Sequence, residues 1–277
     1  MKKKRLIPVL LLKDGFLVQS RSFSTYRNLG NPVTATKRLN AWGPDEIIYL
    51  DISKSDNYDL RRDDIKHPNR NNFLDILEDV AQVTFAPITI GGKVRALRDV
   101  EQRLRKGADK VSINTKALEE PRFITEMANE FGSQCVVVSM DVKIIDGEHR
   151  VMAHGGMKEM RYDPVEWAHI VQNSGAGEIL LNSVDRDGQK VGFDIELIDK
   201  VSSRVRIPVI ALGGAGEWEH FAEVFLRTKA DAVAAANLFQ HMEQSLYLIK
   251  KQLHDHEFPV RRPFISEDLA NEKHDLL

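Results

Sequence analysis

The chain has 277 residues, of which 42% are hydrophobic, and this length and composition suit one domain with a large buried core. The formal net charge is −2 and the pI about 6.5, so no general basic surface indicates nucleic-acid binding. A single cysteine excludes an intrachain disulfide, and no apolar run approaches the roughly 18 residues of a membrane span. We therefore expect a cytoplasmic protein without a nucleic-acid or membrane partner.

Short runs rich in Val, Ile and Leu alternate with amphipathic stretches along the whole chain. The runs predict strands buried on both faces, as in a parallel sheet, and the stretches between them predict helices. One helix is expected to start where Asn31 precedes Pro32, a cap residue followed by proline at the first helical position. The predicted strands are 5–12, 46–53, 86–90, 110–114, 135–141, 178–182, 209–212 and 232–236, and further predicted helices are 72–84, 121–131, 164–174, 194–202 and 217–227.

The second half of the chain repeats motifs of the first half. Gly91-Gly92 returns as Gly213-Gly214, and the segment around Asp109 returns around Asp231, both 122 residues later. Two similar units of alternating strands and helices predict a (β/α)8 TIM barrel built from two half-barrels. We expect one barrel domain over residues 1–256, with halves of about 1–120 and 121–256, followed by a partly flexible tail over 257–277.

The segment 56–72 interrupts this regular plan. It is polar and rich in Asn and Arg, and it follows the second predicted strand, at the carboxyl end of the barrel where active sites of this fold lie. Two interpretations stay open: the segment covers the site or contacts a partner, or it is a solvated loop.

Each Gly pair follows a predicted strand at the carboxyl end of the barrel. Glycines there let backbone N–H groups approach an anion closely, and this end commonly holds phosphate sites. Two copies predict two phosphate sites on opposite sides of the mouth, occupied by a ligand with a phosphate at each end. The alternative is a pair of tight turns without a ligand.

Several long motifs resemble one known family. They are Arg5-Leu6-Ile7-Pro8, Lys13-Asp14-Gly15, Leu50-Asp51-Ile52, the segment 107–115, the segment 131–135, His154-Gly155-Gly156, the segment 175–181, Asp185-Arg186-Asp187-Gly188 and Gly213-Gly214-Ala215-Gly216. The chain is identified by them as a member of the HisF family, the cyclase subunit of imidazole glycerol phosphate synthase. The resemblance implies a lyase that receives ammonia from a HisH-like glutaminase subunit and acts on a bis-phosphorylated substrate. It implies no cofactor and no metal.

The resemblance also implies two catalytic carboxylates, a general acid and a general base at opposite sides of the mouth. Asp141 matches one of them, at the end of the fifth predicted strand. Leu11 stands where the other belongs, and aligning the two half-barrels places Leu11 over Asp141 in the same way. Leucine cannot transfer a proton, and loss of a general acid or base costs roughly 10²–10⁴-fold in rate. Asp14, three residues further on, is an improbable replacement.

Other positions depart from the family pattern near the substrate. Lys93 replaces a third glycine of the first phosphate loop, where a side chain crowds a backbone that needs positive φ. Gln19 replaces a lysine, Leu212 a small polar residue, and Asn237 a serine. Phosphate or substrate contacts are implied at Gly91, Gly92, Lys93, Asn114, Thr115, Asp51, Asp187, Gly188, Gly213, Gly214 and Asn237.

Four charged residues stand at the starts of the predicted strands one, two, four and six: Arg5, Glu46, Lys110 and Glu178. Charges buried there must pair, because an unpaired buried charge is very costly. The resemblance implies that they form the gate through which ammonia enters, and that Asp109 faces the glutaminase partner. A structural plug of salt bridges is the alternative.

An intact gate beneath an incomplete acid–base pair suggests a changed role. Within the family, the chain most resembles the WbuZ-type HisF-like proteins. This resemblance implies that it works with sugar-amidating enzymes of lipopolysaccharide and O-antigen biosynthesis. We therefore predict a subunit that conducts ammonia to a sugar amidotransferase and has weak or no cyclase activity. Two alternatives remain: an active cyclase subunit of histidine biosynthesis, and a phosphoribosyl isomerase-like enzyme.

Overall fold

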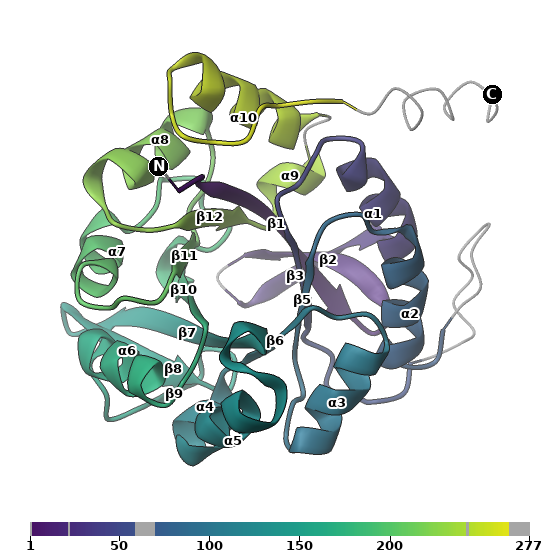
Figure 1. Ribbon diagram of the computed structural model, residues 1–277, viewed down its shortest axis with the longest axis vertical. Coiled ribbons are helices and arrows are strands. Elements are labelled where there is room, and N and C mark those ends of the chain that lie inside the picture. The colour runs from purple at the N-terminus through teal and green to yellow at the C-terminus, as the bar shows by residue number, and fades with distance from the viewer. Residues whose placement is uncertain (1, 22, 59–69, 242–243, 266–277) are drawn as a thin grey trace.

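The computed structural model describes residues 2–21, 23–58, 70–241 and 244–265. Eight parallel strands form its sheet: β1 (Arg5–Lys13), β4 (Ile47–Asp51), β5 (Ile88–Gly91), β6 (Lys110–Ile113), β7 (Val136–Ile145), β10 (Glu178–Ser183), β11 (Val209–Leu212) and β12 (Ala232–Ala235). The last strand pairs with the first, Arg5 lying opposite Ala232, and this pairing closes the sheet into a barrel. Figure 1 shows the ring of strands with helices around it. The predicted (β/α)8 TIM barrel is confirmed.

Helices cover the outside of the barrel. As expected, Pro32 is the first residue of one helix, and the side chain of Asn31 accepts a hydrogen bond from Val33 N at 2.8 Å. No helix within the described ranges is both long and apolar enough to cross a membrane. The helices are α1 (Pro32–Asn40), α2 (Phe73–Val83), α3 (Leu97–Arg105), α4 (Thr115–Glu119), α5 (Arg122–Phe131), η1 (Ser133–Cys135), α6 (Pro164–Asn173), η2 (Val184–Arg186), α7 (Ile195–Ser202), α8 (Trp218–Arg227), α9 (Leu238–His241) and α10 (Ser245–Asp255).

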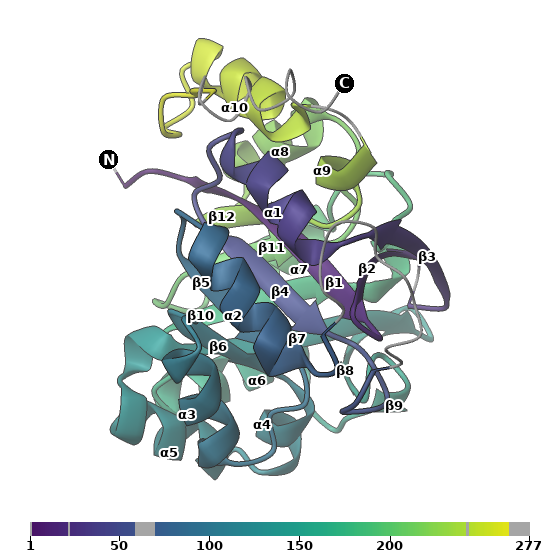
Figure 2. The same ribbon diagram turned by 90° about the vertical axis from the view of Figure 1, so that its right-hand side faces the viewer.

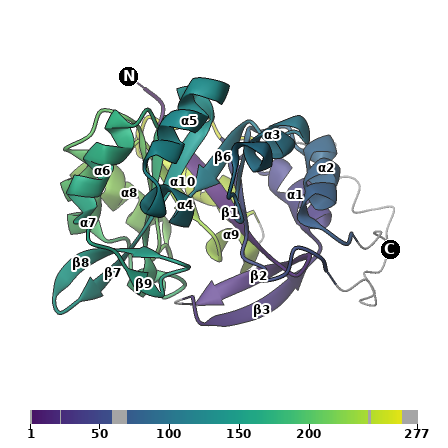
Figure 3. The ribbon, with the colours of Figure 1, turned by 90° about the horizontal axis from the view of Figure 1, so that it is seen from below.

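Two antiparallel extensions were not predicted. A hairpin of β2 (Phe16–Arg21) and β3 (Thr25–Gly30) folds back on β1, while β8 (Glu148–Ala153) and β9 (Lys158–Glu159) extend β7. Figures 2 and 3 show both extensions at the end of the barrel opposite the N-terminus. This is the end where the parallel strands finish; we call it the mouth, and the end where the strands start the floor.

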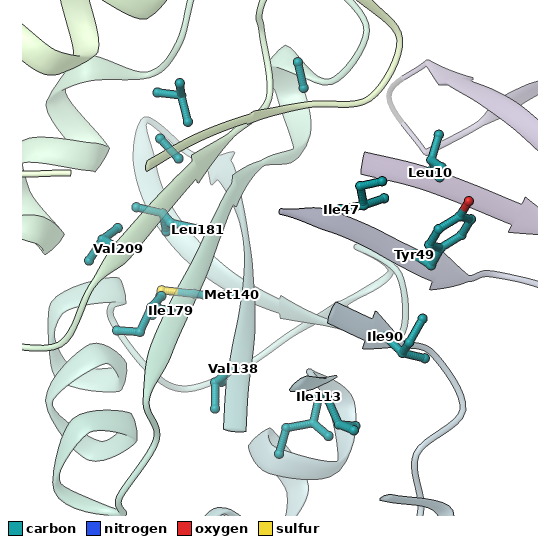
Figure 4. Close-up of a cluster of buried hydrophobic side chains, with 14 of the residues drawn as sticks. Leu10, Ile47, Tyr49, Ile90, Ile113, Val138, Met140, Ile179, Leu181 and Val209 are labelled. Atoms are coloured by element: carbon teal, nitrogen blue, oxygen red, sulfur yellow. The ribbon is translucent and has the colours of Figure 1, made fainter. Parts of the chain in front are cut away.

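Side chains alternate along each strand between the barrel axis and the surrounding helices, as the two-residue period of a strand requires. On β1, Ile7 and Val9 belong to a small apolar cluster inside the barrel, whereas Leu6, Leu10 and Leu12 belong to the large outer cluster. Figure 4 shows part of this outer layer. The inner cluster leaves the space between floor and mouth lined mainly by apolar side chains.

The first and last described segments of the chain meet at the floor. Lys4 N donates to Pro259 O at 2.7 Å, and Lys4 forms a parallel bridge with Val260, which is fully buried. We call residues 258–264 the C-terminal strap. Arg261 Nε lies 3.6 Å from Asp45 Oδ1, which ties the strap to the segment before β4. Residues 59–69 of the expected polar loop and residues 266–277 of the expected flexible tail lie outside the described residues.

A buried ion pair fixes α10 to the floor. Lys250 Nζ lies 3.0 Å from Asp45 Oδ1 and donates to Gly43 O at 2.7 Å, and both charged side chains are almost fully buried. Desolvation lowers the pKa of Lys250, although the neighbouring Asp45 carboxylate acts to raise it. The pair is thus held in surroundings that offer little solvation to either charge.

Removing one partner of this pair is expected to be costly, because the other charge then stays buried without compensation. We predict that Lys250→Met lowers the free energy of unfolding by about 3–5 kcal/mol, measured by urea denaturation at neutral pH. Lys251→Met is the matched control: its exposed pair with Asp255 should contribute far less, because solvent screens exposed ion pairs. Equal losses in the two variants would contradict the prediction.

Candidate active site

Asp141 lies at the mouth with its carboxylate held by two amides. It pairs in register with Asn182 of β10, whose Nδ2 donates to Asp141 Oδ1 at 3.0 Å. Asn114, between β6 and α4, donates to Asp141 Oδ2 at 2.8 Å. The amide oxygens of Asn114 and Asn182 are buried and have no partner among the described residues. The site therefore presents a carboxylate and two free acceptors, which suit a ligand rich in N–H or O–H groups.

The surroundings of Asp141 tune its carboxyl group for proton transfer. Burial raises its pKa to about 6; the hydrogen bonds from Asn182 and Asn114 act in the opposite direction, and the charge of Asp187 adds to the increase. A group that titrates near neutral pH exchanges protons most effectively there. Asp141 is thus chemically suited to act as a general acid or base.

Leu11 occupies the corresponding place on β1. It lies opposite Leu50 of β4 in the ladder, and its side chain packs against the inner apolar cluster. The alternation along β1 places Leu11 on the axis side, as Asp141 is on β7. Asp14 lies in the turn between β1 and β2, where its N–H donates to Ser53 Oγ at 2.7 Å. The β1 side of the mouth is therefore apolar at the position where the β7 side carries a carboxylate.

The second Gly pair borders a hollow at the mouth. It is lined by Asp187, Gly188, Lys190, Leu212, Gly213, Gly214, Ala215, Ala235, Ala236, Asn237 and Leu238. Gly214 has φ of 103°, and a Cβ there would collide with the carbonyl of Gly192, so only glycine fits. Gly92 in the first half has φ of 100°, and a Cβ there would collide with the carbonyl of Asp51 in the same way. The two halves thus repeat in backbone conformation as well as in sequence.

The first Gly pair is covered by an ion pair that the sequence did not reveal. Lys93 adopts a left-handed backbone, with φ of 54°, and its Nζ lies 3.1 Å from Asp51 Oδ2. Tyr58 Oη donates to the same carboxylate oxygen at 3.1 Å. Burial raises the pKa of Tyr58, with the negative charge of Asp51 as the next cause, so this hydroxyl stays a donor. In this structure the Asp51 carboxylate is ion-paired with Lys93, and both of its oxygens accept hydrogen bonds.

Asn237 contacts the hairpin that borders the mouth. Its Nδ2 donates to Ser20 O on β2 at 2.7 Å, and Ser20 Oγ donates to Asp187 Oδ2 at 2.8 Å. Burial raises the pKa of Asp187, against the hydrogen bond from Ser20. Gln19 is on the same strand, opposite Arg27 of β3. These bonds hold the β2–β3 hairpin beside the second Gly pair.

Thr115 also holds a mouth extension in place. It is the first residue of α4, and its Oγ1 accepts from His154 N, just after β8, at 3.0 Å. Within the described ranges no cluster of three His, Cys, Asp or Glu side chains is placed to hold a metal ion. The groups gathered at the mouth therefore include backbone amides, amide side chains, hydroxyls, the lysines Lys93 and Lys190, and the aspartates Asp51, Asp141 and Asp187.

Four charges at the floor form a closed ring. Arg5 lies 2.9 Å from Glu46 and 2.8 Å from Glu178, and Lys110 lies 2.9 Å from each of the same two carboxylates. Thr89 Oγ1 also donates to Glu46 at 2.6 Å. Burial acts to lower the pKa of Arg5, but the charges of Glu178 and Glu46 outweigh it and raise the pKa. Each cation thus bridges both anions across the axis.

Asp109, beside this ring, is exposed at the floor. Its Oδ2 accepts a hydrogen bond from Ile88 N at 2.8 Å, which fixes the start of β5. Cys135 ends η1 rather than opening β7, and it is half-buried. The exposed carboxylate lies next to Lys110 in the sequence, so anything docked over the ring would meet it.

Comparison with known proteins identifies relatives of the whole barrel. A family model described as "Histidine biosynthesis protein" matches residues 5–244. The chain is 42% identical over 260 residues to "Imidazole glycerol phosphate synthase subunit HisF" of Alkaliphilus metalliredigens (strain QYMF), covering 94% of this chain and 99% of the relative. The protein of the same name in Geobacillus thermodenitrificans (strain NG80-2) is 45% identical over 260 residues, 93% of this chain and 99% of the relative.

The pKa of Asp141 predicts a pH-dependent stability. In the unfolded chain this carboxyl has a pKa of 3.8 and in the folded chain about 6, so folding favours its protonated form. Its contribution is complete below pH 4 and is lost as the pH rises through 6. Asp141→Asn should therefore gain stability relative to the natural chain between pH 4 and pH 8, by about 3 kcal/mol.

Urea denaturation of both chains across this pH range measures the difference. Asp146→Asn, at an exposed position of the β7–β8 turn, is the control for the same substitution at the surface. A constant gap between Asp141→Asn and the natural chain would show that Asp141 titrates alike in the folded and unfolded states.

Proposed function

Because the chain belongs to the HisF family, we propose that it is the barrel subunit of a glutaminase-coupled synthase and takes up ammonia through its floor. The observation that carries this proposal is the closed ring of Arg5, Glu46, Lys110 and Glu178 beneath an apolar interior. The cytoplasmic location expected from the sequence is part of the same proposal.

The ring and the interior together favour passage of neutral ammonia. An ammonium ion would meet two cations at the ring and then an apolar interior in which burying a charge is costly. Ammonia carries no charge and can exchange hydrogen bonds with Lys110 or Glu46 as it passes. Opening the ring requires one cation to release one carboxylate, and the remaining ion pairs then keep both carboxylates from being left uncompensated.

For the reaction at the mouth, the names of the relatives favour imidazole glycerol phosphate synthesis over the sugar-amidation role. The hollow beside Gly213-Gly214, and a first Gly pair with the same backbone conformation at Gly92, support a ligand with a phosphate at each end. Asp141, with a pKa of about 6, would act as the general base or acid. This is the cyclase function of histidine biosynthesis, the first alternative of the sequence analysis, and it is the reaction we place first.

Three features of the mouth favour the second candidate, a relay subunit with weak cyclase activity. Leu11 replaces the carboxylate that faces Asp141, Lys93 neutralises Asp51, and Asn237 is bonded to the β2–β3 hairpin. Ammonia that is not consumed at the mouth would serve a separate acceptor enzyme, such as a sugar amidotransferase. The isomerase-like alternative is weaker, because it gives the floor ring no role and needs an acidic residue at position 11.

Turnover separates the two candidates. Given the bis-phosphorylated ribonucleotide and ammonium salts, a cyclase should form imidazole glycerol phosphate about as fast as the named relatives. A relay subunit should form it roughly 10²–10⁴-fold more slowly, because one proton-transfer group is missing. Leu11→Asp should recover much of this loss. Leu50→Asp places a carboxylate on the neighbouring strand of the same inner cluster and should recover nothing. If the natural chain forms imidazole glycerol phosphate at the rate of its relatives, the cyclase function stands and the relay function is excluded.

The floor ring has a separate test. In Lys110→Glu, three carboxylates meet one arginine, so the ring opens or traps protons and ammonia entry is impaired. With a HisH-like glutaminase present, we expect transfer of glutamine nitrogen to the barrel to fall to roughly a tenth or less, while ammonium salts remain as effective as before. Lys106→Glu reverses a surface lysine paired with Glu78 and should change neither. Equal nitrogen transfer in both variants would mean that the ring is only a structural plug.

A further inference from the structure

Two phenylalanines project from the floor end of the barrel. Phe85, between α2 and β5, is 84% exposed, and Phe264, in the C-terminal strap, is 59% exposed. The other ten phenylalanines of the chain are buried or half-buried. Large exposed apolar side chains that gather in one place mark interaction sites, whereas isolated ones carry no meaning. Phe85 and Phe264 therefore mark an interaction site if they belong to one surface.

Both phenylalanines are attached to the segment 40–43, Phe85 through its backbone N–H and Phe264 through its ring. The side chain of Asn40 accepts from Phe85 N at 3.5 Å and donates to the carbonyl of Val83, which fixes the segment that carries Phe85. The ring of Phe264 lies against Gly43, where an added Cβ would be 3.0 Å from the ring. A residue larger than glycine at position 43 would displace this ring. The two phenylalanines thus share one support, although they are far apart in the sequence.

The support is rigid. Gly43 O and Asp45 both bind the buried Lys250, and Asp45 Oδ2 also accepts from Leu6 N at 2.8 Å. The strap is held by its bridge to Lys4 and by Arg261 beside Asp45. The ring of Phe264, held in this way against Gly43, loses little conformational freedom on binding, so more of its contact energy appears as affinity.

The surface adjoins the floor ring. Asp45 immediately precedes Glu46, and Lys4 immediately precedes Arg5, so the turn and the strap are anchored beside two of the four ring residues. Phe264 lies twenty residues beyond the part of the chain that the family model matches. Exposed Arg261 and Arg262 precede Phe264 in the strap and give it a positive charge.

We propose that Phe85 and Phe264, together with the turn 40–43, form an apolar anchor on which the glutaminase subunit docks. This inference rests on the proposed function, because a subunit that delivers ammonia to the ring must cover the floor. The matching surface of that subunit is an apolar pocket for two aromatic rings, bordered by carboxylates that face Arg261 and Arg262. Aromatic side chains inside a polar rim are the usual dominant contacts of such interfaces. A second copy of the chain in this place would block the entrance to the ring.

The anchor is tested with the HisH-like glutaminase encoded by the same organism, titrated against the full-length chain. We expect Phe85→Ser and Phe264→Ser each to raise the Kd roughly tenfold, and the double variant roughly a hundredfold. Met157→Ser is the matched control: Met157 is 83% exposed but lies beyond β8 at the mouth end, so its Kd should stay within about twofold. Circular dichroism and urea denaturation check that the exposed substitutions leave folding unchanged.

The outcomes are distinguishable. If the natural chain binds the glutaminase and the double variant binds it equally well, the anchor is wrong and the proposed function stands. If the natural chain does not bind the glutaminase at all, the proposed function fails and the anchor with it. If the double variant only converts a dimer of this chain into a monomer, the two rings serve self-association and the inference is overturned.

Discussion

Each strand of the closed barrel points alternate side chains toward the axis, and closure leaves no freedom to shift this alternation. Arg5, Ile7, Val9 and Leu11 therefore form one inward column on β1, and Glu178, Leu180 and Asn182 form another on β10. The same period sets the ring at one end, the apolar interior and the mouth at the other. A slip of one residue in any strand would remove a charge from the ring and a functional side chain from the mouth together.

The two ends of these columns differ in how completely their groups are satisfied. At the floor, two cations and two anions neutralise each other within short distances. At the mouth, Asp141 keeps a raised pKa and two neighbouring amide oxygens without partners among the described residues, while Asp51 is fully engaged by Lys93 and Tyr58. The groups available for proton transfer and hydrogen bonding to a ligand therefore lie around Asp141, whereas the charge of Asp51 is already paired with Lys93.

Much of this arrangement could be predicted from the sequence, because the strands are apolar runs and the Gly pairs repeat. The charged residues at the strand starts predicted a ring, since buried charges must pair. The hairpin β2–β3 was missed because Thr25–Gly30 is polar and largely exposed, which removes the alternation that identifies a strand. The contacts of Lys93 and Asn237 were missed for another reason: each reaches a partner on a strand distant in the sequence, Asp51 on β4 and Ser20 on β2, and spacing along the chain does not predict such contacts.

The pairing of Arg5 with Ala232, and of Lys4 with Val260, has a consequence for biosynthesis. Of the eight barrel strands β1 is translated first and its neighbour β12 last, so one edge of β1 stays open until the other strands have been made. Contacts so distant in sequence form slowly and leave unpaired edges available for aggregation in the meantime. Closure of the barrel therefore depends on β12 and on the segment around Val260, although both lie far from β1 in the sequence.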